Sequence, residues 1–426
     1  MSEQYQQMWA ELGLDLEAHD ALLATLGQVY QDIYLAQPNR PKAMEYFDFV
    51  MSEVHGLRIK ELIDAKNQGR KVIGSFCVFV PEEIILAVDG ISVGLCAGAE
   101  FGFDLAEKVL PRNTCSLIKS AFGFKLGKVC PYIESCDVVV GENTCDGKKK
   151  AYEIFQDMVD DLYILDLPQS KTDQGRRLLR EEYRGFIGKM EAVSGRTITV
   201  ENLQKAIETV NQKRQALARL RSLRSANPVP ISGLDALLIN QISFYDDPVR
   251  FTASVNKLCD ELEQRVAHKE GVFPADTPRI LMSGCPMAVP NWKLPSIVES
   301  TGAVIVGEES CVGERGTRGL VDSRGGGMEE MLDNIVERYL QIDCAIFTPN
   351  PERRNNIDSM TSMYKADGIL HYSLQFCQPY SIESGLIENQ MEDNGIPVLR
   401  IETDYSMEDV GQLKTRVEAF MERISQ

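Results

Sequence analysis

Residues 111–150, PRNTCSLIKSAFGFKLGKVCPYIESCDVVVGENTCDGKKK, contain four of the eleven cysteines of the chain. Cys115 and Cys145 each stand directly before a helix-like segment, and the apolar run 137–140 leads into the second one as a strand. A thiolate at the N-terminal end of a helix gains from the helix dipole and from unpaired N–H groups, so it suits metal binding. A single cysteine is more simply interpreted as a buried core residue. The two together favour a metal or redox site.

The composition narrows the class of protein. The 426 residues are 44% hydrophobic and 25% charged, which is typical of a soluble chain of two or three domains. The net charge is −18 and no basic run is longer than 148–150, so we expect no nucleic-acid surface. The acidic N-terminus lacks a signal-peptide core, and no apolar run is long enough to span a bilayer. We therefore expect a cytoplasmic protein with no membrane partner.

The eleven cysteines and four histidines indicate which metals to expect. Cytoplasmic thiols stay reduced, so this number of cysteines favours metal or redox chemistry over disulfides. The scarcity of histidine disfavours a His-rich zinc or non-haem iron site. Soft thiolate ligands select iron–sulfur clusters, zinc or copper(I).

The chain alternates between strand and helix patterns in two separate regions. The expected strands are 71–75, 91–95, 137–143 and 162–168 in the first region, and 279–284, 303–310, 342–350, 368–376 and 396–404 in the second. Such alternation predicts parallel sheets with helices on their faces. The predicted fold class is α/β, with two Rossmann-like (flavodoxin-like) parallel-sheet lobes that face a cluster cleft and are joined by a helical segment. The expected divisions are an N-terminal helical segment 1–70, a first lobe 71–168, a helical connecting region 169–275 and a second lobe 276–426.

The cysteines follow the strands in a repeated order. Cys77, Cys96 and Cys145 come after strands of the first region, and Cys115 opens a helix at the same edge. Cys285, Cys311 and Cys377 repeat this order in the second region. Ligands bind at the carboxyl ends of parallel strands, so two facing lobes would gather these sulfurs in one cleft.

The remaining cysteines are predicted to lie elsewhere. Cys130, Cys136 and Cys344 stand before or at the start of an expected strand, which places them toward the opposite edge. Cys259 falls within a helical pattern and is interpreted as a core residue.

Several common sites are disfavoured. There is no CxxC pair for structural zinc, no ferredoxin-type cysteine run, and no phosphate-binding G-x-x-x-x-G-K-[ST] loop. Any ATP chemistry would therefore need another chain. Acidic and histidine side chains near the strand ends are interpreted as helix-dipole partners or solvated groups, and no catalytic residue is assigned; they are Glu82, Glu83, Glu142, Glu308, Glu309 and His371.

Five segments together resemble a known superfamily. They read PEEIILAVDG, RNTCSLIKSAFG, VVVGENTCDGKKK, HYSLQFCQPYSIES and IPVLRIETDYS. From about residue 53 to the end, the chain is similar to the 2-hydroxyacyl-CoA dehydratase and benzoyl-CoA reductase superfamily. The resemblance implies a 4Fe-4S cubane held by three cysteines, at positions that match Cys115, Cys145 and Cys377.

Additional cysteines resemble the double-cubane branch of that superfamily. They are Cys77, Cys96, Cys285 and Cys311. The branch implies an [8Fe-9S] cluster of two sulfide-bridged cubanes on six cysteines, in homodimeric anaerobic reductases. A separate ATP-hydrolysing activator with its own 4Fe-4S cluster would supply electrons for a small unsaturated substrate. We expect Cys285, Cys311 and either Cys77 or Cys96 to hold the second cubane, and these last two are not separated.

Two other functions stay open. The chain could be a dehydratase subunit with a single 4Fe-4S cluster that acts on an acyl-CoA. It could also be a non-catalytic iron–sulfur carrier or scaffold, although a cysteine set shared by two lobes argues against an easily released cluster.

Overall fold

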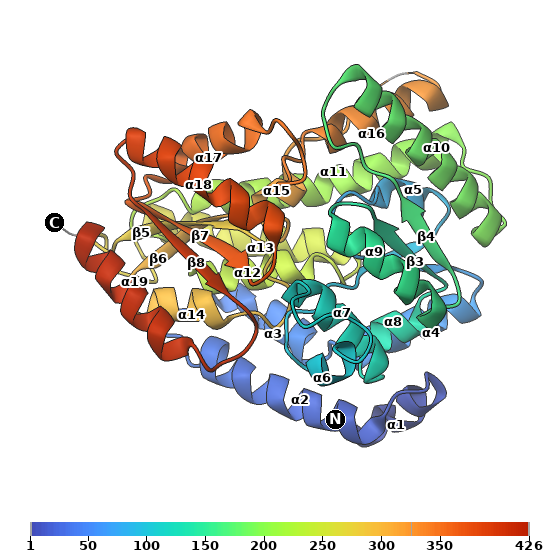
Figure 1. The fold of residues 1–426 in the computed structure, drawn as a ribbon, viewed down its shortest axis with the longest axis horizontal. Coiled ribbons are helices and arrows are strands. Elements are labelled where there is room, and N and C mark those ends of the chain that lie inside the picture. Colours follow the sequence, from blue (N-terminus) through green and yellow to red (C-terminus); the bar gives the residue numbers. More distant parts are fainter. Residues whose placement is uncertain (1, 325, 425–426) are drawn as a thin grey trace.

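The computed structural model describes residues 2–324 and 326–424 and contains two four-stranded parallel sheets (Figure 1). The first sheet has the order β2-β1-β3-β4 and comprises β1 (Val72–Ser75), β2 (Ile91–Gly94), β3 (Val138–Glu142) and β4 (Leu162–Leu165). The second has the order β6-β5-β7-β8 and comprises β5 (Arg279–Gly284), β6 (Val304–Glu309), β7 (Gly368–Leu374) and β8 (Val398–Thr403). The two orders are equivalent, and every neighbouring pair of strands is parallel. The predicted α/β class and its repeat are confirmed.

The prediction of a strand at 342–350 is wrong. This segment is irregular and connects two helices. Its apolar side chains are buried at alternating positions, as they would be in a strand. Its backbone, however, forms hydrogen bonds with side chains and loops and not with a neighbouring strand. Asn350 Nδ2 donates to the Asp343 and Cys344 carbonyl oxygens at 3.3 and 2.9 Å, and the Thr348 N–H donates to the Gln169 carbonyl at 2.9 Å.

Helices surround both sheets. The N-terminal helices are α1 (Ser2–Glu11), α2 (Leu16–Tyr30), α3 (Glu45–Ser52) and α4 (Leu57–Asn67), with short turns η1 (Gln31–Leu35) and η2 (Lys42–Met44). The first lobe carries α5 (Glu82–Ala87), α6 (Phe103–Ala106), α7 (Ser116–Leu126), α8 (Pro131–Ser135), α9 (Asp146–Phe155) and η3 (Gln156–Met158). The connecting helices are α10 (Asp173–Ser194), α11 (Val200–Leu223), α12 (Gly233–Ile242) and α13 (Pro248–Ala267). The last group is α14 (Lys293–Ser300), α15 (Glu314–Thr317), α16 (Met328–Leu340), α17 (Pro351–Tyr364), α18 (Gln378–Asp393) and α19 (Val410–Ile424).

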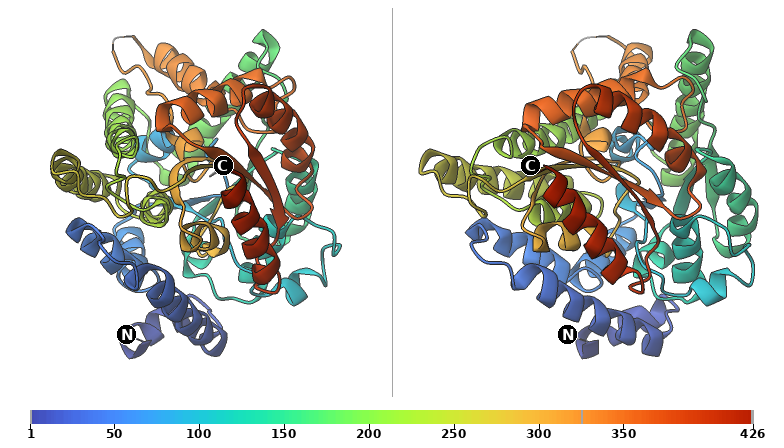
Figure 2. Two further views of the ribbon diagram at one scale, coloured as in Figure 1. Left: turned by 90° about the vertical axis from the view of Figure 1, so that its left-hand side faces the viewer. Right: turned by 60° about the vertical axis from the view of Figure 1, so that its left-hand side comes forward.

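One apolar core joins the two lobes. Every residue of α12 is buried, and this helix packs against β6, α14 and α3. The largest cluster of buried side chains includes Val93 of β2, Leu238 of α12 and Ile280 of β5. Figure 2 shows the N-terminal helices, in blue, along one edge of the molecule. The lobes therefore share a continuous interior.

The second half of the chain also completes the first lobe. Helix α16 lies beside α10 and α11, away from the second sheet (Figure 1). Its Ile335 and Tyr339 belong to one buried cluster with Ile73 of β1 and Val140 of β3. The predicted domain boundaries stay predictions, but the segment 328–347 packs with the first lobe.

None of the helices in the described part of the chain has both the length and the apolar character that crossing a membrane requires.

Candidate metal centre

A cavity lies between the lobes, at the carboxyl ends of strands from both sheets. It contains about 1020 Å³ of space free of protein atoms, counting the part open to solvent. Eight cysteines line it: Cys77, Cys96, Cys115, Cys145, Cys285, Cys311, Cys344 and Cys377. The structure thus brings all seven predicted positions together and adds Cys344.

The other three cysteines lie elsewhere. Cys130 and Cys136 flank the short helix α8, and the Cys136 thiol donates to the Tyr132 carbonyl at 3.1 Å. Cys259 is fully buried in α13, which confirms its interpretation as a core residue.

Helix N-termini position three of the cavity cysteines. Cys115, Cys145 and Cys377 are the N-cap residues of α7, α9 and α18. Helices α7 and α9 start where the sequence predicts, whereas no helix was predicted after Cys377. Unpaired N–H groups in the first turn of each helix favour a thiolate there.

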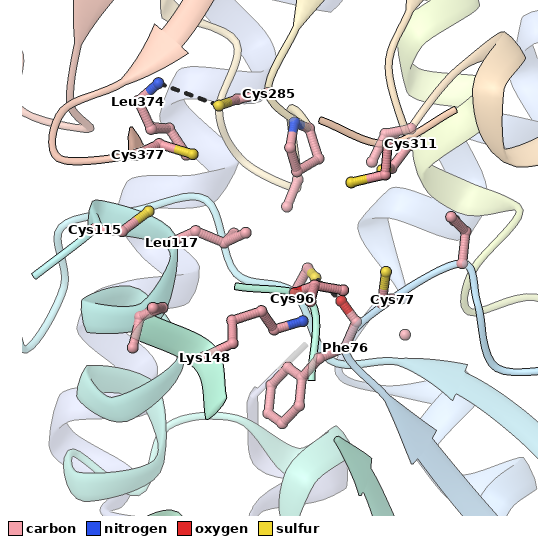
Figure 3. A pocket seen from close by; sticks show the side chains of 18 of the residues that line it. Phe76, Cys77, Cys96, Cys115, Leu117, Lys148, Cys285, Cys311, Leu374 and Cys377 are labelled. Atoms are coloured by element: carbon pink, nitrogen blue, oxygen red, sulfur yellow. Dashed lines mark hydrogen bonds between the residues drawn. The ribbon is translucent and has the colours of Figure 1, made fainter. Parts of the chain in front are cut away.

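Cys115, Cys285 and Cys377 lie together on one side of the cavity (Figure 3). The pKa of Cys115 is raised, first by its hydrogen bond with the Cys377 thiol and then by burial. The pKa of Cys377 is raised because Cys285 and burial outweigh the opposing effect of Cys115. The Leu374 N–H donates to Cys285 Sγ at 3.3 Å. These thiols are close enough to influence each other's protonation.

A second group comprises Cys77, Cys311 and Cys344. Burial raises the pKa of Cys77, and Glu142 raises it further against the opposing effect of Lys148, with smaller contributions from the Cys311 and Cys344 thiols. Arg315 Nη1 lies 3.6 Å from Cys311 Sγ, and the Tyr380 hydroxyl lies 3.7 Å from Cys344 Sγ. In Figure 3, Cys77 and Cys311 lie across the cavity from Cys115 and Cys377.

Cys344 corrects a sequence prediction, because it was expected at the far edge of the second sheet. It lies instead in the buried loop after α16 and faces the same cavity as the other thiols. No local pattern around Cys344 signals this position, since it depends on how the loop packs between the lobes.

Cys96 differs from the other cavity cysteines. Its thiol donates to the Phe76 carbonyl oxygen at 2.9 Å. Burial raises the pKa of Cys96, which keeps the sulfur protonated and suits this donor role.

The remaining wall of the cavity is mainly apolar and includes Phe76, Leu117, Phe244 and Val312. Among the described residues that line it, Lys148 alone carries a full formal charge. Its ammonium points into the cavity near Cys96 (Figure 3).

The acids near the strand ends are paired, and all but the half-buried Glu82 are buried, so they are not solvated groups; Glu82 and Glu83 do lie in the first turn of α5, as the helix-dipole interpretation expects. Glu83 pairs with Arg214 at 2.7 Å, Glu308 with Arg224 at 2.5 Å, and Glu309 with Arg315 at 2.7 Å. Glu142 pairs with Lys148, and Glu82 of the first turn of α5 pairs with Lys213.

His371 is fully buried in β7. Burial, with Arg353 nearby, lowers its pKa to about 3. The imidazole is therefore neutral at physiological pH.

The donor set fits an iron–sulfur cluster. Sulfur ligands, an apolar wall and an N–H donor to sulfur are the features by which proteins hold such clusters and set their potential. Among the described residues, no three His, Cys, Asp or Glu side chains come close enough to share a single metal ion. The cavity thus suits a polynuclear group, whose metals separate the thiolates, better than one zinc ion.

The sequence of this chain matches a known family of proteins. The family model described as 2-hydroxyglutaryl-CoA dehydratase, D-component, matches residues 77–424. The chain belongs to this family.

Three relatives illustrate its range. YjiM of Escherichia coli (strain K12), which carries the name of a dehydratase subunit, is 37% identical over 88% of this chain and 96% of its own length. The (R)-phenyllactyl-CoA dehydratase beta subunit of Clostridium sporogenes is 27% identical over 84% of this chain and 93% of its own length. A benzoyl-CoA reductase subunit of Thauera aromatica is 22% identical over 78% of this chain and 85% of its own length. The family thus includes subunits of both dehydratases and reductases.

Proposed function

We propose that this protein is an iron–sulfur reductase with a double-cubane [8Fe-9S] cluster in the cavity between its lobes. A separate ATP-hydrolysing 4Fe-4S activator would supply low-potential electrons, and the substrate would be a small unsaturated molecule. The observation that supports this most is the set of eight cysteines in one cavity, since a single cubane on three cysteines would leave five thiols without a role.

The cysteines would divide between two cubanes. Cys115, Cys145 and Cys377, each at the start of a helix, would hold the first cubane. Three of the other cavity thiols would hold the second. The bound cluster would supply electrons at low potential, which is chemistry that side chains alone do not provide.

The protein's own residues would control the environment of the cluster. Apolar side chains such as Leu117 and Phe244 exclude water from the wall of the cavity. Lys148 is paired with Glu142 at 3.1 Å and places a positive charge beside the thiols. Burial lowers the pKa of Lys148, but Tyr152, Glu142 and the neighbouring thiols outweigh burial and raise it well above its usual range. Lys148 therefore keeps its proton and acts as a fixed charge.

The partners in this proposal are the activator and a second copy of the chain. The chain carries no P-loop motif, so ATP hydrolysis would belong to the activator. A net charge of −18 favours a partner with a basic docking face.

The main alternative is a dehydratase subunit with one 4Fe-4S cluster and an acyl-CoA substrate. Two relatives are named as dehydratase subunits, which favours this alternative. A non-catalytic iron–sulfur carrier fits less well. Cys285 and Cys344 are buried, and the thiols come from both lobes, so a cluster here would not be released easily.

Iron and acid-labile sulfide on anaerobically purified protein test the proposal. We expect about eight irons per chain, falling toward about four in either Cys145→Ser or Cys311→Ser. About four irons, unaffected by Cys311→Ser, would support the single-cubane dehydratase. Cluster transfer to an apo-acceptor, without ATP-dependent reduction by an activator, would support a carrier. No bound iron would exclude all three functions.

A further inference from the structure

Cys344 reaches the cavity through the irregular loop between α16 and α17. The loop is held in place by Asn350, whose amide donates to the Cys344 carbonyl oxygen at 2.9 Å. The Cys344 side chain is 6% exposed, and its sulfur lies 3.7 Å from the Tyr380 hydroxyl. The thiol is therefore fixed inside the cavity wall.

Arg315 and Tyr380 connect Cys344 to Cys311. Arg315 Nη1 lies 3.6 Å from Cys311 Sγ and also donates to the Tyr380 hydroxyl oxygen. Since that oxygen accepts from Arg315, its own proton is free to be donated to Cys344 Sγ. One fixed pair of side chains thus presents a donor to each sulfur.

Arg315 is itself held rigidly. It is 1% exposed and donates to both carboxylate oxygens of Glu309, at 2.7 and 2.9 Å, and to the Gly284 carbonyl at 3.2 Å. Asp343, next to Cys344, lies 3.7 Å from Arg315 Nε. A buried guanidinium with these partners has little freedom to move, so its position relative to the sulfurs is preorganised.

Cys77 completes the group from the first lobe. It lines the same cavity as Cys311 and Cys344 and lies, like Cys311, across that cavity from Cys115 and Cys377 (Figure 3). Two rival cysteines are otherwise engaged. Cys96 donates its thiol proton to the Phe76 carbonyl, and Cys285 lies with Cys377 on the other side of the cavity.

We propose that Cys77, Cys311 and Cys344 are the three ligands of the second cubane, and that Arg315 and Tyr380 are positioning residues which donate hydrogen bonds to two of the thiolates. As Fe²⁺ or Fe³⁺ and sulfide assemble in the site, each S–H bond is replaced by an S–Fe bond and its proton goes to solvent. The sulfur of each cysteine keeps its oxidation state. This inference rests on the proposed double-cubane cluster and names the ligands of its second half.

Iron content of four single variants tests this ligand set. The iron content should fall from about eight per chain toward about four in Cys344→Ser and in Cys77→Ser. It should stay at about eight in Cys96→Ser and Cys259→Ser. Cys96 is the matched control inside the cavity, and Cys259 is the control outside it. Full iron in Cys344→Ser or in Cys77→Ser, or a halved iron content in Cys96→Ser, would overturn the assignment. The iron content of the wild-type protein tests the double-cubane cluster separately. About four irons per wild-type chain would refute the proposed function, independently of the iron content of the variants.

Tyr380→Phe provides a second measurement if Cys344→Ser does not fold. The variant should keep about eight irons and show a more negative midpoint potential in an electron paramagnetic resonance titration, because hydrogen bonds to sulfur stabilise the reduced cluster. Tyr364→Phe, a buried tyrosine of α17 that does not line the cavity, is the matched control and should leave the potential unchanged. An unchanged potential in Tyr380→Phe would contradict the positioning role and the placement of Cys344 at the cluster.

Discussion

Lys148 Nζ lies 3.1 Å from Glu142 Oε2, and this ion pair sits at the wall of the cysteine cavity. Glu142 is at the end of β3 and Lys148 is in α9, so the pair spans the strand and helix that flank Cys145. Burial raises the pKa of Glu142, while Lys148 opposes that shift. Each group makes it possible for the other to stay charged inside the protein.

Lys148→Met should destabilise the protein by about 3–5 kcal/mol, because it leaves the Glu142 carboxylate buried without a counter-charge. Urea unfolding of the metal-free protein measures this change. The double variant Lys148→Met/Glu142→Gln should recover most of the loss, since a neutral amide replaces the unpaired charge. Equal stability of Lys148→Met and wild type would show that the ion pair contributes nothing.

Glu299 should make stability fall as the pH rises from about 4.5 to about 7. Burial raises its pKa to about 7, and its carboxylate accepts from the N–H groups of Gly233 and Ile305 at 2.7 and 3.2 Å. The folded state therefore holds a proton that the unfolded state, with a carboxyl pKa near 4.5, has already released. The stability linked to this group is fully present below pH 4.5 and is lost as the pH rises through about 7.

Glu299→Gln tests this linkage because its amide stays neutral at every pH. Its stability relative to wild type should grow from near zero at pH 4.5 to about 3 kcal/mol at pH 8, less any hydrogen bond that the amide loses. Denaturant unfolding at several pH values measures the difference. A difference that does not change with pH would contradict the raised pKa.

Gly284→Ala should unfold at a clearly lower denaturant concentration than wild type. Gly284 has φ +128°, and a Cβ there would lie 1.9 Å from the Tyr372 carbonyl oxygen. That oxygen also accepts from the Cys285 N–H at 2.9 Å, so the clash would displace a cavity cysteine. Both a loss of stability and a reduced iron content are expected.

Gly302→Ala is the matched control for this effect. Gly302 also has a positive φ, +87°, but a Cβ there would meet no described atom within 4 Å. Gly302→Ala should lose only about 1–2 kcal/mol of stability, from backbone strain, and should leave the iron content unchanged. Similar results for the two variants would mean that the contact with Tyr372 has no consequence.

Arg224→Ala should cost about 3–5 kcal/mol, because Arg224 and Glu308 form a buried pair with two N–O distances of 2.5 and 2.6 Å. Arg219→Ala, near the same end of α11, removes exposed pairs with Asp260 and Glu263 and should cost less than about 1 kcal/mol. Thermal unfolding of both variants checks the contrast. A larger loss of stability in Arg219→Ala than in Arg224→Ala would contradict this prediction.

Much of the fold follows from short-range patterns. Eight strands and the starts of α7 and α9 lie where the sequence predicts them. Buried parallel strands appear in the sequence as apolar runs, and the two helices begin directly after Cys115 and Cys145. The common edge of Cys77, Cys96 and Cys145 then follows from the topology of a parallel sheet.

Long-range packing explains what the patterns do not predict. The apolar residues around Cys344 imitate a strand, but Asn350 donates to the Asp343 and Cys344 carbonyl oxygens, and this segment pairs in neither sheet of the described residues. From the sequence, Glu308 is interpreted as a solvated acid, because its partner Arg224 lies 84 positions earlier and only the fold brings the two together. The division of the cavity thiols into two groups likewise depends on how the lobes face each other.

The position of α16 has a consequence for protein synthesis. This helix, residues 328–340, belongs to the same buried apolar cluster as side chains of β1 and β3, which are synthesised long before it. A ribosome-bound chain that has emerged only to residue 275 therefore exposes the surface that α16 later buries. This cluster of the first lobe is complete only after α16 has been synthesised, and until then its unburied apolar side chains favour aggregation or chaperone binding.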